Sequence, residues 1–349
     1  MSTDRLRAPE CLGSQIEIIS LPYEQGPCGG VWRILKIADI ALEEINGRES
    51  LYTNHDLVHN VPLMAEYKRR GLFVFENNWN LVPFQSQSFV IPSAHGVGPD
   101  FFAEANKRGC IVLEDSTCQL VKKVEYEAKA AVGRGYHILY LGSLLKDGRL
   151  HPEPDGIRKH LPEVSMDILI KPEDLEGYDF EEDQPLMVLT QTTLSRLETK
   201  DFVAMIRAKW PWVEVKDDIC YATDNRQMAV SELLKPVNGV DLLLVVGSES
   251  SHNSQELMKI GLKGNIESYA FDDPSKLDPN WLIGKKHPMV TSGASAIRVY
   301  VDQLVSNIIE IAPAARVVHE DPVSNEDIEM VFKYQEQEIR EKIRAKYAA

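Results

Sequence analysis

Strand-sized apolar segments alternate with amphipathic helical segments along the chain, and this alternation limits the fold more than any other feature of the sequence. A helical pattern from Val31 to Ile45 keeps its apolar residues on one face, with Gly47 as the expected stop. Strands separated by helices form βαβ units, so the pattern predicts an α/β fold with mostly parallel sheets. The expected strands cover residues 16–21, 71–75, 88–91, 110–113, 137–141, 186–189, 213–215, 242–246 and 288–290.

Length and charge narrow the class of protein further. The 349 residues are enough for two or three domains. The net charge of −15 argues against nucleic acid as a partner, because phosphates would repel an acidic surface. No apolar run reaches the length of a membrane span, and the first residues lack the apolar segment of a signal peptide. We therefore expect a cytoplasmic protein with neither a nucleic-acid nor a membrane partner.

Several expected strands end in a small, polar cluster that leads into a helix. In parallel α/β sheets, ligands bind outside the carboxyl ends of the strands. Hydroxyls, amides and helix N-termini gathered at that edge can hold an anion without lysine or arginine. Helix capping would explain one such cluster, whereas a repeated pattern predicts a shared anion site. The clusters are residues 92–97, 190–195, 247–254 and 291–296.

The cysteines indicate a metal centre rather than disulfides. The chain has an odd number of cysteines, widely spaced, which makes a disulfide framework improbable without a signal peptide. Cys28, Cys118 and Cys220 each stand where an extended segment runs into a helix, and a helix N-terminus stabilises a thiolate. Cys11 and Cys110 are expected to be ordinary thiols.

The spacing of Cys28, Cys118 and Cys220 also suggests a division of the chain. Each interval is long enough for one small α/β unit. Three lobes that each present one thiolate to a common centre would hold a metal group with three protein ligands. Structural zinc normally takes four ligands, while an iron–sulfur cluster held by three cysteines leaves one iron open to substrate.

Short motifs in this order resemble the IspH/LytB family, the 4-hydroxy-3-methylbut-2-enyl diphosphate reductases of the non-mevalonate isoprenoid route. Residues 190–195 (TQTTLS) and 217–227 (DDICYATDNRQ) are the most specific of them. The resemblance covers about residues 16–312. The remaining matching segments are 28–31, 55–60, 93–97, 115–118, 151–153, 251–254 and 293–296.

The resemblance implies three pseudo-related α/β domains in a trefoil around a central [4Fe–4S] cluster held by Cys28, Cys118 and Cys220. The expected domains are 16–117, 118–216 and 217–312, with the first strand assigned either to its own domain or to the third. A disordered tail, 1–15, precedes them. A linker and C-terminal helix, 313–349, follow, and a capping-box pattern at 324–327 with an apolar stripe predicts a helix docked on the body.

The implied reaction removes the hydroxyl of (E)-4-hydroxy-3-methylbut-2-enyl diphosphate, giving isopentenyl and dimethylallyl diphosphate. Ferredoxin or flavodoxin would supply two electrons, one at a time. Glu153 and Thr192 would deliver the proton, since hydroxide is a poor leaving group. Residues implied to hold the allylic diphosphate are His59, His95, His151, Thr193, Ser251, His252, Asn253 and Ser295. We expect the other histidines, His55, His137, His160, His287 and His319, to be structural.

Two departures from the family pattern concern the expected pocket. His252 stands where the family usually has serine, and the segment 142–150 before His151 is longer than usual. These departures leave open a diverged paralogue that reduces a related allylic diphosphate. A non-redox iron–sulfur (de)hydratase would keep the same cysteines, and a non-catalytic, zinc-stabilised or metal-free binding protein is a third alternative.

Overall fold

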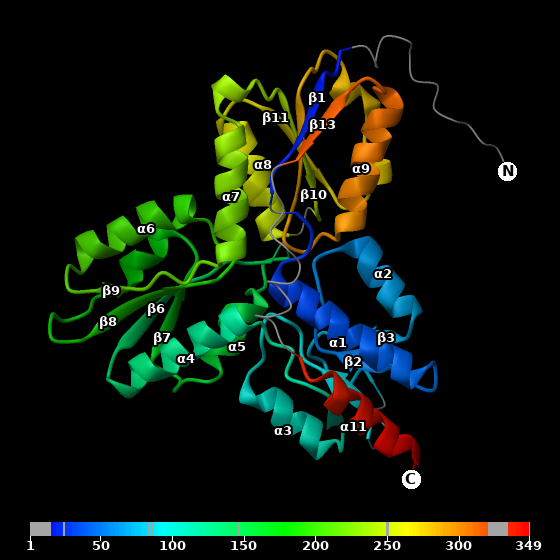
Figure 1. The fold of residues 1–349 in the computed structure, drawn as a ribbon. Helices are drawn as coiled ribbons and strands as arrows, with labels where there is room; N and C mark the ends of the chain where they lie inside the picture. The colour runs from blue at the N-terminus through cyan, green and yellow to red at the C-terminus, as the bar shows by residue number, and fades with distance from the viewer. Residues whose placement is uncertain are drawn as a thin grey trace. The chain divides into compact units, whose positions relative to one another are not determined.

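The computed structural model describes residues 15–23, 25–82, 84, 87–145, 147–248, 251–319 and 334–348, and Figure 1 shows its fold. The expected tail lies outside these residues except for Gln15, as do Cys11 and the capping-box pattern at 324–327. Contacts divide the chain into two compact units. One unit comprises Met1–Cys28, His59–Pro62 and Asp224–Asp327, and the other comprises Gly29–Val58, Leu63–Thr223 and Ile328–Ala349.

The larger unit contains two four-stranded parallel sheets. The first has the order β3-β2-β4-β5 and is accompanied by helices from the same part of the chain. Buried aromatic side chains, among them Phe75 and Phe101, form its core with Val90. Its elements are α1 (Gly29–Ile45), β2 (Leu51–Thr53), α2 (Val61–Arg69), β3 (Leu72–Val74), β4 (Phe89–Ile91), α3 (Pro99–Lys107) and β5 (Ile111–Val112).

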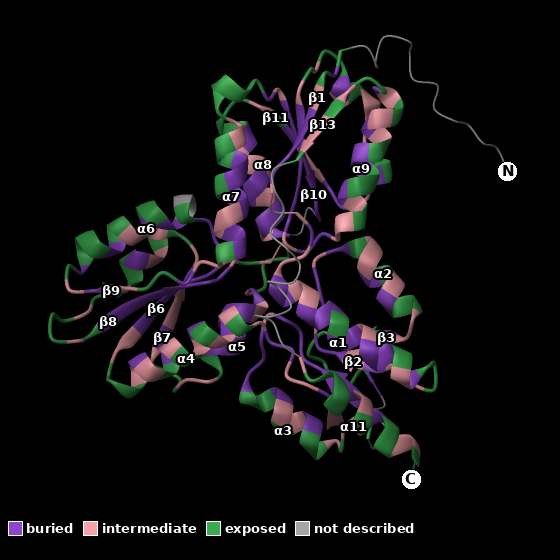
Figure 2. Ribbon diagram, in the orientation of Figure 1, coloured by how far each residue is buried: buried purple, intermediate pink, exposed green. Residues whose placement is uncertain are grey.

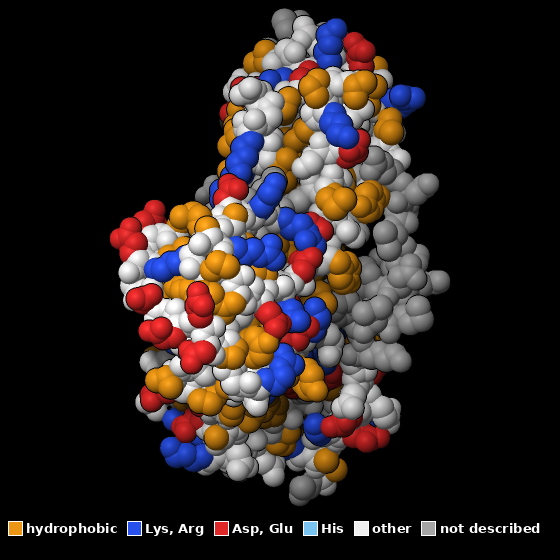
Figure 3. Space-filling view, turned by 90° about the vertical axis from the view of Figure 1, so that its left-hand side faces the viewer, with side chains coloured by type: hydrophobic (Ala, Val, Ile, Leu, Met, Phe, Trp, Pro, Cys, Tyr) orange, Lys and Arg blue, Asp and Glu red, His pale blue; other side chains and the backbone are white. Residues whose placement is uncertain are grey.

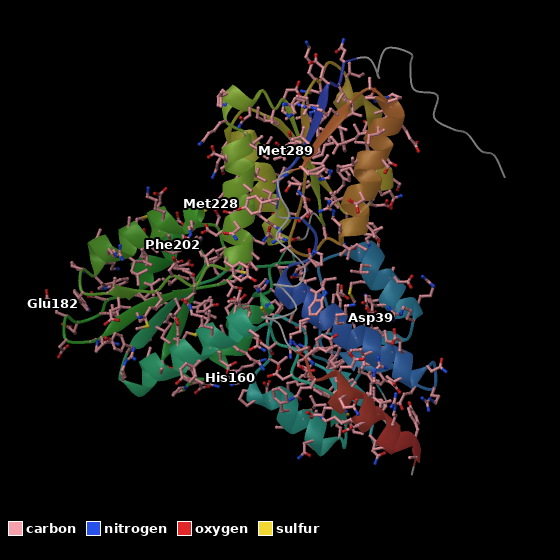
Figure 4. All side chains as sticks on the ribbon, viewed as in Figure 1. Asp39, His160, Glu182, Phe202, Met228 and Met289 are labelled. Carbon is pink, nitrogen blue, oxygen red and sulfur yellow. The ribbon has the colours of Figure 1, made fainter. Side chains whose placement is uncertain are left out.

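The second sheet has the order β7-β6-β8-β9 and is covered on both faces. Along β6, Ile138 and Tyr140 pack with residues of α4, while Leu139 and Leu141 pack with residues of α6. Burial on both faces explains why β6 and β8 are continuous apolar runs, and Figure 2 shows them buried. Figure 4 marks Phe202, which α6 contributes to this core. The elements are α4 (Gln119–Gly133), β6 (His137–Leu141), α5 (Pro152–Arg158), β7 (Met166–Leu169), β8 (Leu186–Thr190), α6 (Arg196–Lys209) and β9 (Glu214–Val215).

The smaller unit is built on a five-stranded parallel sheet with the order β11-β10-β12-β1-β13. Alternate residues of β10 again serve two cores: Leu244 packs with residues of α9, and Leu243 packs with Leu257 of α8 and with Met289. Figure 4 marks Met289 within this sheet. The elements are β1 (Ile18–Leu21), α7 (Tyr221–Leu233), β10 (Leu242–Val246), α8 (His252–Lys263), β11 (Glu267–Phe271), β12 (Pro288–Ser292), α9 (Arg298–Ile311) and β13 (Arg316–His319).

The first strand therefore belongs to the third sheet. β1 pairs with β12 through Ser20 and Met289, and with β13 along four residue pairs. The α/β class with parallel sheets is confirmed, while the domain boundaries stay a prediction. Strands β2, β7, β11 and β13 were not expected from the sequence. They are short or carry polar residues such as Asp167 and Glu267, which weaken the apolar signal.

A C-terminal helix, α11 (Glu336–Ala348), packs against α1 within the larger unit. Ile339 and Ile343 of the predicted apolar stripe are fully buried. Hydrogen bonds from Arg344 and then Arg340 lower the pKa of Glu44 on α1 to about 2. The helix thus has the docked arrangement that its apolar stripe predicts.

On the face shown in Figure 3, lysine and arginine side chains are interspersed with aspartate and glutamate.

Candidate active site

The three cysteines of the expected metal centre all lie at helix starts. Cys28 directly precedes α1, Cys118 is the N-cap residue of α4, and Cys220 directly precedes α7. Each is half-buried and carries a thiol rather than a disulfide. Their backbone N–H groups donate to the carbonyls of Ala294, Ala94 and Thr192 at 2.8–2.9 Å. These bonds fix each cysteine to a loop that follows a strand end.

Space beside the Cys118 thiol is kept open by a glycine. A Cβ atom at Gly30 would lie 2.6 Å from the sulfur of Cys118, closer than real Cβ contacts come. Thiolate sulfurs are the protein ligands of iron–sulfur clusters. The donor type, the helix-start positions and this clearance all fit a cluster held by cysteines.

Glu153 lies in a hydrogen-bond network within the larger unit. It is the second residue of α5, after Pro152, and its N–H donates to the ring Nδ1 of the N-cap residue His151 at 3.2 Å. The Thr192 N–H donates to Glu153 Oε1 at 2.8 Å, and the Thr192 hydroxyl donates to Oε2 at 2.8 Å. A third donor is the Tyr140 hydroxyl, 3.0 Å from Oε1. The loop after β8 is thereby joined to the start of α5.

Burial decides the protonation of Glu153. The residue is 1% exposed. Burial raises the pKa of Glu153 to about 7, although the hydrogen bonds from Thr192 and Tyr140 act to lower it. A carboxyl group with this pKa is partly protonated at neutral pH and can serve as a general acid.

Other predicted residues surround Glu153 in the same unit. The rings of His95 and His151 meet edge to face, with centroids 5.0 Å apart. Thr193 is oriented by Gln191, whose amide donates to the Thr193 hydroxyl at 2.8 Å. Gln191 Oε1 in turn accepts from the N–H and the hydroxyl of Ser143 at 3.0 Å. The structure therefore brings His151, Glu153 and Thr192 into one hydrogen-bonded group, with His95 against His151.

The smaller unit brings together the remaining predicted polar residues in two groups. Ser251 is the N-cap residue of α8, so Asn253 lies in the first turn of that helix, and both are buried. Ser295 donates through its hydroxyl to the carbonyl of His59 at 3.2 Å. His252 is the first residue of α8 and is half-buried. A helix N-terminus with buried hydroxyl and amide side chains favours an anion.

Two glycines let the ends of β10 and β12 approach the first turn of α8. A Cβ atom at either Gly247 or Gly293 would lie 2.1 Å from the hydroxyl oxygen of Ser254. The Gly293 N–H donates to the carbonyl of Val246 at 2.9 Å. The Ser254 side chain is fully buried, and its hydroxyl has no hydrogen-bond partner among the described protein groups. A buried hydroxyl without a protein partner is what an anion-binding pocket would leave for its ligand.

Comparison with known proteins agrees with this geometry. The family model described as LytB protein matches residues 19–309. The chain belongs to the LytB family. A 4-hydroxy-3-methylbut-2-enyl diphosphate reductase of Shewanella halifaxensis is 37% identical over 300 residues, which make up 85% of this chain and 93% of that protein. A relative of the same name, numbered 1, from Rhodopseudomonas palustris is 36% identical over 314 residues, or 89% of this chain and 97% of the relative.

A solved structure extends the LytB match to the fold. The E-1-hydroxy-2-methyl-but-2-enyl-4-diphosphate reductase from Plasmodium falciparum has a TM-score of 0.82 and 26% sequence identity. The match covers 95% of this chain and 99% of the Plasmodium chain. The predicted family is thus confirmed, and so is the α/β fold class. Over the described residues, no helix combines the length and the apolar character that crossing a bilayer requires.

Several residues of this LytB chain were missed by sequence reasoning. Tyr140 lies in an apolar strand and therefore looked like a core residue. Gly30 and Ser254 lie in segments that match the family, but the close approaches that they make were not predicted. Gln191 belongs to the matched motif but was given no role. Only the Gly-rich and Ser-rich character of the loops indicated tight packing there.

Four of the histidines expected to be structural have structural partners. His55 contacts Glu76, His137 contacts Asp167, and His287 contacts Ser20, each at 2.7–3.0 Å. His160, marked in Figure 4, lies 2.9 Å from the carbonyl oxygen of Val97. These contacts account for the four histidines, so none of them needs a catalytic role to explain its position.

Gly30→Ala tests the clearance beside Cys118. Alanine favours a helix by about 1 kcal/mol over glycine, so a purely local effect would stabilise α1. We expect instead a lower content of iron and acid-labile sulfide in anaerobically purified protein, because the new methyl group displaces the thiol.

The matched control for this substitution is Gly133→Ala at the end of α4, where an added Cβ meets nothing within 4 Å. Unchanged iron and sulfide in the Gly30 variant would show that the close approach does not matter for metal binding.

Proposed function

We propose that this chain reduces (E)-4-hydroxy-3-methylbut-2-enyl diphosphate, removing its hydroxyl group as water to give isopentenyl and dimethylallyl diphosphate. The observation that carries the proposal is the buried Glu153 carboxyl, with a pKa of about 7 and a direct hydrogen bond to the Thr192 hydroxyl. The relatives' names, which specify this substrate and a reductase, support it.

The Thr192 hydroxyl connects the acid to the substrate in this proposal. A threonine hydroxyl both accepts and donates, so it can accept the proton of Glu153 while donating its own to the leaving hydroxyl. Water is a far better leaving group than hydroxide, and general acid catalysis of this kind contributes about 10²–10⁴-fold. The enclosed position of Glu153 keeps bulk water from taking the proton instead.

The diphosphate is assigned to eight polar residues, three of which are His95, His151 and Thr193. The N-terminus of α8 supplies backbone donors and the favourable end of the helix dipole. Imidazoles donate hydrogen bonds to phosphate oxygens and gain charge near neutral pH. The other five residues assigned to the diphosphate are His59, Ser251, His252, Asn253 and Ser295.

Cys28, Cys118 and Cys220 are assigned as the ligands of a [4Fe–4S] cluster. When bound, such a cluster supplies one-electron transfer and a Lewis-acidic iron with no cysteine ligand. The two electrons of the reaction come from a ferredoxin or flavodoxin and are balanced by two protons: one leaves with the hydroxyl as water, and the other is added to a carbon of the allyl group. The enzyme acts in the cytoplasm. The chain's own residues bind the diphosphate, exclude water and hold the proton.

Turnover with and without a reductant tests the proposed function. We expect anaerobic enzyme to convert the hydroxylated allylic diphosphate only when a strong one-electron reductant such as reduced methyl viologen is present. The measurement is product analysis by mass spectrometry. Equal turnover without reductant would identify a (de)hydratase, and faster turnover of another allylic diphosphate would identify a diverged paralogue.

A further inference from the structure

Tyr140 places a phenol hydroxyl among the apolar residues 138–141 of β6. It is the last residue but one of the strand, between Leu139 and Leu141, and no part of its side chain is exposed. Its ring packs in the core shared with α4, beside Val121 and Val124. A buried tyrosine hydroxyl needs a hydrogen-bond partner. Here the partner is Oε1 of Glu153, 3.0 Å away, so the strand interior is connected directly to the proposed acid.

The two oxygens of Glu153 have different surroundings. Oε1 accepts from two donors, the Thr192 N–H at 2.8 Å and the Tyr140 hydroxyl at 3.0 Å. Among the described residues, Oε2 has one partner, the Thr192 hydroxyl at 2.8 Å. A backbone N–H can only donate, and a carboxyl oxygen has two lone pairs. Both lone pairs of Oε1 are therefore in use when Tyr140 donates.

We propose that Tyr140 is a positioning residue for Glu153, which occupies Oε1 together with the Thr192 N–H and so places the acidic hydrogen on Oε2, facing the Thr192 hydroxyl. This inference rests on the proposed acid role of Glu153. It assigns a direction to the proton: from Oε2 to Thr192 Oγ1, and from that hydroxyl to the leaving group. If Oε1 were protonated instead, its hydrogen would compete with the two groups that donate to Oε1, the Thr192 N–H and the Tyr140 hydroxyl.

The charges around this pair keep Tyr140 a donor. Burial raises the pKa of Tyr140 well above its usual value, and the carboxylates of Glu153 and Asp218 raise it further. Burial and then the neighbouring Glu127 raise the pKa of Asp218, while Lys123, 3.6 Å from Asp218, acts to lower it. His151 meets Glu153 through its ring nitrogen and the Glu153 N–H, away from the carboxyl oxygens that Tyr140 and Thr192 contact. Tyr140 therefore keeps its proton over the pH range in which Glu153 titrates.

Tyr140→Phe tests the proposal by moving the pKa of Glu153. The tyrosine hydroxyl stabilises the carboxylate, so its loss raises the pKa of Glu153. A hydrogen bond to a charged group contributes about 1.5–3 kcal/mol, which corresponds to an upward shift of about one unit or more. Two measurements should show the same shift: the pH profile of turnover, and the infrared carbonyl band of the protonated carboxyl in the anaerobic holoenzyme. We also expect the low-pH plateau of turnover to fall several-fold, because the proton is no longer confined to Oε2.

Tyr136→Phe is the matched control. Tyr136 directly precedes β6, and its hydroxyl also donates to a glutamate, Glu214. Unlike the bond of Tyr140, this hydrogen bond is exposed. We expect this variant to leave the pH profile and the infrared band unchanged. Glu153→Gln assigns the band, which must disappear in that variant.

A second substitution keeps the shape of the site if Tyr140→Phe folds poorly. Site-specific 3-fluorotyrosine at position 140 makes the phenol a stronger donor and should shift the pKa of Glu153 downward. An unmoved pKa in both variants would overturn the positioning role. If Glu153→Gln kept full turnover, the acid role itself would fail, and that result is distinct from a failure at Tyr140.

Discussion

Replacement of Cys220 by alanine is expected to remove most of the iron and acid-labile sulfide from anaerobically purified protein and to reduce turnover to background. Cys220 has a half-buried thiol at the start of α7, and its N–H is fixed to the carbonyl of Thr192 at 2.8 Å. A cluster with three cysteine ligands that loses one keeps only two thiolates, and no other cysteine lies within fifteen residues in the sequence to replace it. Iron and sulfide analysis, with the visible absorption of the cluster, measures the loss.

The matched control is Cys110→Ala. Cys110 is also a half-buried thiol in the larger unit, and burial raises the pKa of Cys110. We expect the Cys110 variant to keep its iron, sulfide and turnover. If Cys220→Ala retained a full complement of iron and sulfide, Cys220 would not be a ligand and the assignment of all three cysteines would need revision.

The sequence predicted the sheets well where apolar runs are buried on both faces. β6 and β10 have the expected bounds, because short apolar runs mark them: residues 138–141 in β6 and 242–246 in β10. β11 was missed because Glu267 and Ser268 interrupt its apolar pattern. The pairing of β1 with β12 and β13 depends on residues far away in the chain, so the sequence left two choices for that strand.

The residues of the candidate site also differ in whether the local sequence or only distant contacts could indicate their role. Cysteines at helix starts are visible locally, because a strand, a turn and an amphipathic pattern surround each one. The contact of Tyr140 with Glu153 joins strand β6 to the start of helix α5. The apolar pattern of β6 gives no sign of this contact. Ser254 is similar, because its packing against Gly247 and Gly293 requires two strand ends to meet one helix turn.

Glu153→Gln is expected to reduce turnover by about 10²–10⁴-fold, the usual contribution of a general acid. Glutamine has nearly the same shape as a protonated glutamate. Its oxygen can accept from the Thr192 N–H and from Tyr140 in place of Oε1, and its amide can donate to the Thr192 hydroxyl in place of Oε2. The variant therefore keeps the hydrogen bonds of the site but has no proton to release, so the affinity for substrate and the iron content should stay near wild type.

The pH dependence of the wild-type enzyme follows from the same residue. Glu153 acts in its protonated form, and its pKa of about 7 lies above the value of about 4.3 for a free glutamate. Turnover should therefore hold steady below about pH 7 and fall as the pH rises through the pKa, because the acid loses its proton. The folded protein also retains this proton at pH values where the unfolded chain has released it, so the contribution of Glu153 to stability is fully present below about pH 4.3 and is lost progressively as the pH rises to about 7.

Comparison of Glu153→Gln with a control variant separates the effect of Glu153 on stability from its effect on turnover. Glu153→Gln should remove the fall in stability between about pH 4.3 and about pH 7, because a neutral amide does not titrate. It should also leave a low turnover that no longer depends on this pKa. Glu104→Gln is the control, since Glu104 is a carboxylate on α3 that is paired with Arg108 and Lys107. A glutamine variant with wild-type turnover would assign the proton to another donor. A wild-type rate that rose through pH 7 would show that Glu153 acts as a base, because its ionised form would then be the active one.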